Sequence, residues 1–115
     1  MGQFVEKKVD WLDSSEQTAS ENSSWWTVDQ YDELIIFLRV SAVNTAGTLD
    51  VKVQTKDPDG NAVDLTGATF TQVTSGTGNE YIAILVYGSQ VRVAVTIGSS
   101  GDYDYKIHAY AKGVK

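Results

Sequence analysis

The sequence predicts an all-β protein: an antiparallel β-sandwich of about eight strands, jelly-roll-like and without a significant helix. Two observations favour this fold class. Apolar and polar residues alternate with a period of two, and turn-forming residues separate the alternating segments at short, regular spacing. Alternation places one side of a strand in a core and the other in water. Many short strands between turns are typical of sandwiches, jelly rolls and barrels.

The alternation is clearest in the second half of the chain. Leu49, Val51 and Val53 are separated by polar residues, and similar patterns run over 91–97 and 103–109. Segments rich in Val, Ile, Thr and Tyr also favour strands. We therefore expect strands near 3–12, 25–29, 33–43, 48–56, 67–74, 80–87, 90–97 and 102–111.

Turn signals lie between these segments. The clearest is Asp57-Pro58-Asp59-Gly60, in which proline presets the first turn dihedral and glycine accepts a positive φ. Further connections are expected at 44–47, 75–79 and 98–101.

The N-terminal part of the chain gives a weaker signal. We expect one domain over 1–115, in which residues 1–12 form a strand or an arm that packs partly on a neighbouring subunit. Residues 13–24 read DSSEQTASENSS, a polar segment that we predict to be a loop or a short, frayed helical turn.

Composition excludes several function classes. The chain has 115 residues and no cysteine, so disulfides and thiolate metal sites are impossible. A formal net charge of −6 argues against a nucleic-acid partner and against an anionic membrane surface. Residues 1–10 contain no apolar stretch, so we expect no secretory signal peptide.

The segment Glu33–Val43 departs from simple alternation. Leu34 begins one apolar face, while Ile35 and Phe37 lie on the other face, which should be wet. A strand that is apolar on both faces is covered either by another part of its own chain or by a second subunit. Both explanations stay open at this point, and Ile35 and Phe37 are candidate interface residues.

Few residues suggest chemistry. His108 is the single histidine and alternates outward, and no nucleophile, metalloprotease or phosphate-loop motif is present. We expect no catalytic residue and no cofactor, so the chain should not be an enzyme. A weak calcium candidate is the acidic turn formed by Asp57, Asp59, Asn61 and Asp64, although a plain hairpin turn explains the same residues.

Two adjacent tryptophans are the remaining candidates. On a strand the rings of Trp25 and Trp26 face opposite ways, so one is expected to anchor the core and the other to point outward. An outward ring could seal an interface or stack on a sugar. Packing is the preferred interpretation, and a glycan partner is the alternative.

The chain also resembles small structural proteins of tailed bacteriophages and prophages. The similarity covers roughly residues 13–113 and rests on the order and spacing of short pieces: Tyr31-Asp32-Glu33-Leu34, Ala46–Thr55, Asp57–Gly60, Asp64-Leu65, Ala68–Val73, Val91-Arg92-Val93, Gly98 and Ala111-Lys112-Gly113. The family tends to carry Trp after the Asp-Gly turn, where this chain has Asn61-Ala62-Val63.

The resemblance implies a β-sandwich virion component, such as a capsid decoration protein, a head fibre or a minor tail protein. It implies a homo-oligomer that contacts other virion proteins and is assembled in the host cytoplasm, and it transfers no catalytic residue. The alternative is a carbohydrate-binding β-sandwich module that uses an exposed Trp.

Overall fold

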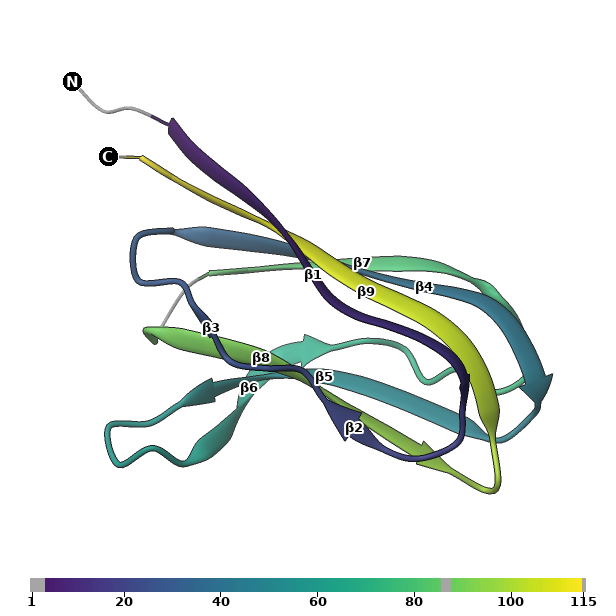
Figure 1. Cartoon of the computed structure of the whole chain (residues 1–115). Coiled ribbons are helices and arrows are strands. Elements are labelled where there is room, and N and C mark those ends of the chain that lie inside the picture. Colours follow the sequence, from purple (N-terminus) through teal and green to yellow (C-terminus); the bar gives the residue numbers. More distant parts are fainter. Residues whose placement is uncertain (1–3, 86–87, 115) are drawn as a thin grey trace.

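The computed structural model describes residues 4–85 and 88–114. They form two antiparallel sheets that face each other and contain no helix, which confirms the predicted fold class (Figure 1). Sheet A has the order β1 (Phe4–Gln17), β9 (Asp102–Val114), β4 (Glu33–Thr45) and β7 (Gly78–Leu85). Sheet B has the order β2 (Glu21–Asn22), β8 (Gln90–Gly98), β5 (Thr48–Lys56) and β6 (Ala62–Thr69), and β3 (Trp26–Thr27) also pairs with β8.

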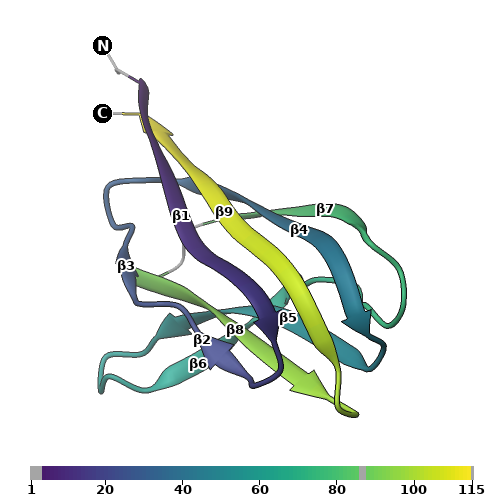
Figure 2. The ribbon, with the colours of Figure 1, turned by 45° about the vertical axis from the view of Figure 1, so that its right-hand side comes forward.

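The pairing is that of a jelly roll, a long hairpin rolled up on itself. β1 pairs with β9, β2 and β3 with β8, β4 with β7, and β5 with β6. Pairing of β4 with β9 and of β5 with β8 completes the two sheets. The first and last described residues, Phe4 and Val114, consequently pair side by side at one end of β1 and β9 (Figure 2). Each sheet mixes strands from both halves of the sequence.

The core is one cluster between the sheets. The segments with the clearest alternation supply most of it, as predicted, because every second residue of these strands points inward. The fully buried side chains include Leu34, Ile36, Leu49, Val51, Val53, Val93, Tyr103, Tyr105 and Ile107. The part of the chain that the structure describes has no helix long and apolar enough to cross a membrane.

The prediction of a loop over 13–24 is wrong for much of that segment. β1 continues to Gln17 and stays paired with β9, and Glu21 and Asn22 pair with β8. β1 pairs with β9 of its own chain from Phe4 onward, so the described part of the N-terminal segment forms an edge strand of sheet A.

Polar side chains of residues 13–24 attach this segment to both sheets through hydrogen bonds, a role that buried apolar side chains have elsewhere in the fold. Ser23 Oγ accepts the backbone N–H of Val93 at 2.9 Å, and Ser20 Oγ accepts that of Ile97 at 3.0 Å. The Glu21 carboxylate accepts hydrogen bonds from Ser14 Oγ at 2.8 Å and from the Tyr105 hydroxyl. Burial and this carboxylate raise the pKa of the Tyr105 phenol. Glu21 thus ties the edge of sheet B to sheet A.

One further strand differs from its prediction. The strand expected at 67–74 lies at 62–69, because the turn after β5 leads directly into paired residues from Ala62. Beyond β6 the backbone keeps only isolated contacts with β5, such as the bridge between Val73 and Leu49. The ends of two predicted strands, residue 3 and residues 86–87, lie outside the described residues.

Candidate interaction surface

Sheet A has an outer face that no described element covers (Figures 1 and 2). Ile35 and Phe37 of β4 lie at its middle, half-buried, with Ile36 between them pointing into the core. Of the two explanations for this strand, cover by another part of the chain is therefore wrong for the described residues. Ile35 and Phe37 instead belong to an open apolar surface.

The register of the sheet determines which residues share this surface. Across β7, β4 and β9, in that order, the outward side chains form successive rows. We call this array the aromatic face; its rows are Leu85–Glu33–Lys112, Ala83–Ile35–Tyr110, Tyr81–Phe37–His108 and Asn79–Arg39–Lys106. The two inner rows are apolar or aromatic, and the two outer rows carry the charges.

The aromatic rings of this face contact one another. Phe37 lies edge-on to His108 and to Tyr110, with ring centroids 5.5 and 6.4 Å apart, and it lies tilted beside Tyr81 at 6.2 Å. Tyr81 nevertheless stays 66 % exposed and Leu85 55 % exposed. Large apolar side chains gathered on one open face of a domain indicate a contact surface.

Two shallow hollows flank Phe37. One, of about 180 Å³, is lined by Phe37, His108, Ala109 and Tyr110. The other, of about 390 Å³, lies on the β7 side and is lined mainly by Phe37, Arg39, Asn79, Glu80, Tyr81 and His108. The aromatic face therefore has hollows beside its rings, and side chains of a partner can insert into them.

Charges border the aromatic face. Asp10 of β1 lies near its β9 side, with Oδ1 3.8 Å from Lys106 Nζ and 3.9 Å from His108 Nδ1. Glu33 begins β4 and Arg39 lies near the middle of this strand, each in an outer row of the face, and neither makes an ion pair with another described residue. His108 is therefore part of an aromatic surface, and the Asp10 carboxylate lies beside it.

Both tryptophans are half-buried, and their rings have different surroundings. Trp26 packs against the core, edge-on to Trp11 at 5.7 Å and near Tyr31 at 6.0 Å. The Trp25 ring carries two cations, with Lys56 Nζ 4.7 Å and the Arg92 guanidinium carbon 4.6 Å from its centroid. Such cation–π contacts occupy the ring surface that a sugar would need.

The candidate calcium turn does not bring its carboxylates together. Asp57 Oδ1 accepts the backbone N–H groups of Asp59 and Asn61, and the bond from Asn61 is the main reason why its pKa is lowered. Asp64 instead pairs with Gln54 and Lys52, whose hydrogen bonds lower its pKa too. Among the described residues, no three His, Asp or Glu side chains form a possible metal site. The residues of this turn stabilise the hairpin.

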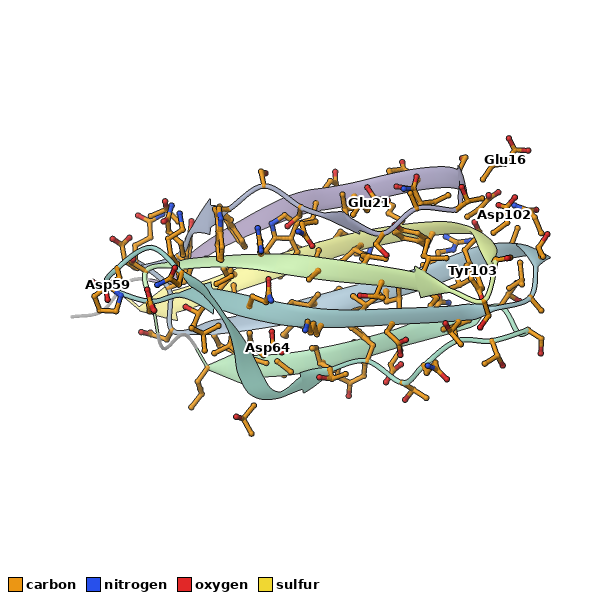
Figure 3. The ribbon with its side chains drawn as sticks, turned by 90° about the horizontal axis from the view of Figure 1, so that it is seen from below. Glu16, Glu21, Asp59, Asp64, Asp102 and Tyr103 are labelled. Atoms are coloured by element: carbon orange, nitrogen blue, oxygen red, sulfur yellow. The ribbon has the colours of Figure 1, made fainter. Side chains whose placement is uncertain are left out.

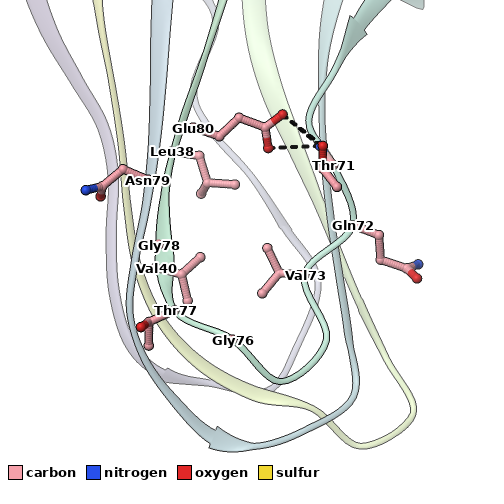
Figure 4. Close-up of a pocket in the computed structure, with 10 residues that line it drawn as sticks. All are labelled: Leu38, Val40, Thr71, Gln72, Val73, Gly76, Thr77, Gly78, Asn79 and Glu80. Atoms are coloured by element: carbon pink, nitrogen blue, oxygen red, sulfur yellow. Dashed lines mark hydrogen bonds between the residues drawn. The ribbon is translucent and has the colours of Figure 1, made fainter.

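The remaining carboxylates are dispersed. Asp59 lies at one end of the sandwich, and Glu16 and Asp102 lie at the other (Figure 3). Glu80 closes a hollow of about 190 Å³ behind β7, where its carboxylate accepts the backbone N–H of Thr71 at 3.0 and 3.2 Å (Figure 4). The lining of this hollow is largely apolar. The Glu80 carboxylate already accepts hydrogen bonds from Thr71 and thereby fixes the loop that follows β6.

Fold and surface together define a class: an open jelly-roll sandwich with an uncovered aromatic face on one sheet. No protein-family model matches the sequence, and no curated protein matches it significantly.

Solved structures share the fold. One is an SPBc2 prophage-derived protein, YomS, with a TM-score of 0.69 and 13 % identity, covering 98 % of this chain and 97 % of that one. Another, from work on Bacillus endospore appendages described as disulfide-linked pili, has a TM-score of 0.62, 14 % identity and coverage of 96 % and 88 %. A chain of infectious bursal disease virus, Gx strain, has a TM-score of 0.56 and 13 % identity, with 96 % of this chain matching 32 % of that one.

Proposed function

We propose that this chain is a non-enzymatic structural protein of a phage-type particle, a capsid decoration or other minor structural protein that acts through packing against copies of itself and against other virion proteins. The observation that carries the proposal is the aromatic face. An acidic, otherwise polar domain keeps Phe37, Tyr81, Leu85 and Tyr110 together on an uncovered sheet. Burying such a surface stabilises an assembly.

The structural neighbours support the same proposal. The likeness to the prophage-derived protein extends over nearly the full length of both chains. Further neighbours come from a spore appendage and from a virus. The proposed location is the virion, with assembly in the host cytoplasm.

Removing the exposed apolar side chains of the face is expected to weaken self-association. In the double variant Tyr81→Ser, Leu85→Ser the association constant should fall at least about tenfold, because aromatic anchors at the centre of an interface contribute most of its binding energy. Sedimentation velocity over a range of concentrations measures the change. The matched control is Val63→Ser on β6, a residue 45 % exposed outside the face, which should associate like the unmodified chain. Equal association of all three proteins would contradict the proposal.

A carbohydrate-binding module is the rival function. It predicts that the chain is pulled down by an insoluble polysaccharide and that Trp25→Ala abolishes this binding. The contacts of Trp25 with Lys56 and Arg92 leave it less suited to stack on a sugar, which is why assembly is the preferred function.

A further inference from the structure

The rows of the aromatic face are arranged symmetrically about one level of the sheet. Ile36 of β4 pairs with Ile82 on one side and with Ala109 on the other, so these residues mark one level across the sheet. The rows on either side of this level are matched: an apolar row lies directly above and directly below it, and a charged row lies beyond each.

We propose that the aromatic face binds the same face of a second copy. The two copies are related by a two-fold axis that lies between their two A sheets, runs perpendicular to the strands and passes over Ile36. This proposal rests on the proposed function, because it specifies the self-contact through which the chain assembles. Each β4 then runs antiparallel to the partner's β4, and each row lies over the row at equal distance on the other side of the level. An interface of this kind is isologous, so every contact occurs twice.

Side-chain size fits this pairing. The exposed ring of Tyr81 lies over the small Ala83 of the second copy, and Ile35 lies over Phe37. Leu85 lies over the row that begins with Asn79, where the hollow of about 390 Å³ opens. A protruding side chain is thus set against a hollow on the second copy.

The charges of the outer rows also fit the proposed two-fold pairing. Glu33 and Arg39 are equally distant from the level of Ile36, so Glu33 of each copy lies over Arg39 of the other. A two-fold axis that ran along the strands would instead set Glu33 over Glu33 and Arg39 over Arg39. Like charges placed together disfavour a complex, and opposite charges steer and orient one.

One pair in the proposed arrangement is unfavourable. Lys112 lies over Lys106, at the β9 side of the face. Asp10 is 3.8 Å from Lys106 Nζ and offsets part of this repulsion, and both lysines lie in the outer rows, where long side chains turn toward water.

The size of the face is adequate for a dimer. With β1 beside the three strands of the aromatic face, sheet A has four strands about 4.8 Å apart and about eight residues at 3.3 Å each, which gives an outer face of roughly 20 by 25 Å, or about 500 Å² in projection. Protruding rings make its accessible area larger than its projection. A specific interface buries about 800 Å² on each partner, so one face of sheet A is of the required order.

Charge reversal tests the geometry. Glu33→Arg alone and Arg39→Glu alone each turn two attractive pairs into two repulsive ones, and each should raise the dimer dissociation constant about 30-fold. The double variant Glu33→Arg, Arg39→Glu restores opposite charges at both places and should dimerise like the unmodified chain. Within one copy the two residues are about 20 Å apart along the strand, so restoration reports a contact between copies.

The unmodified chain and the variants are compared by sedimentation equilibrium, with thermal unfolding as a check on folding. If the unmodified chain stays a monomer at every concentration, both this pairing and the self-packing in the proposed function are wrong. If it associates but the single variants associate equally well, or the double variant does not recover, the two-fold pairing is overturned while assembly through another contact stands.

Discussion

Gly47→Ala is expected to lower the free energy of unfolding by about 3 kcal/mol. Gly47 lies in the turn between β4 and β5, where a Cβ would come within 2.5 Å of Gly101 Cα and 2.6 Å of the Gly98 carbonyl oxygen. Both obstacles are backbone atoms of the turn between β8 and β9, so no side-chain rotation relieves the clash. Urea unfolding measures the loss, which corresponds to a decrease in Tm of about 10 to 20 °C.

The control for this prediction is Gly76→Ala. A Cβ at Gly76 meets no atom within 4 Å, and its φ lies outside the left-handed region, so this variant should be as stable as the unmodified chain or slightly more stable. If Gly47→Ala unfolds at the same urea concentration as Gly76→Ala, the two turns do not meet as described.

Tyr103→Phe is expected to cost about 2 kcal/mol of stability. Tyr103 is fully buried in the core, and its hydroxyl accepts the backbone N–H of Gly47 at 3.0 Å and donates to the Thr74 carbonyl at 2.8 Å. Phenylalanine keeps the ring but leaves both backbone groups without this partner. The same urea titration measures the change.

Tyr81→Phe serves as the control, because it removes a hydroxyl from a ring that is 66 % exposed. Its stability, measured at a concentration where the chain is monomeric, should equal that of the unmodified protein. A Tyr103→Phe variant as stable as this control would show that the hydroxyl does not hold the turn of Gly47 to the segment after β6.

Alternation predicted the core well because it follows from strand geometry alone. Leu49, Val51 and Val53 point inward in β5, and Tyr103 and Tyr105 do so in β9, as their spacing indicated. Strand partners were not predictable in the same way. Pairing of β1 with β9 joins the two ends of the chain, and no local pattern in either segment encodes that contact.

The polar segment 13–24 was mispredicted for a related reason. Its serine hydroxyls accept backbone N–H groups of β8 in sheet B, and its Glu21 carboxylate binds Tyr105 in sheet A, so the segment is held by polar groups instead of buried apolar surface. Ser23 is buried and bonded to Val93, seventy positions away, so serine there looks like a loop residue in the sequence and acts as an anchor in the fold. A pattern based on hydrophobicity cannot detect an anchor of this kind.

Only part of the aromatic face could be recognised from the sequence. Ile35 and Phe37 stand out in the sequence because they make one strand apolar on both faces. Tyr81, Leu85 and Tyr110 belong to the same surface but come from β7 and β9, and only the register of the sheet brings them beside Phe37. Trp25 and Trp26 drew attention as aromatic neighbours in sequence, yet neither lies in the aromatic face.

Hydroxyl-radical footprinting of the unmodified chain at rising concentration tests the central claim, that the aromatic face is where this protein packs. Tyr81, Leu85 and Tyr110 should lose reactivity together as the concentration rises, because the face becomes covered, while Val63 on β6 keeps its reactivity. Unchanged reactivity of the three face residues at concentrations where the chain self-associates would place the contact elsewhere and contradict the claim.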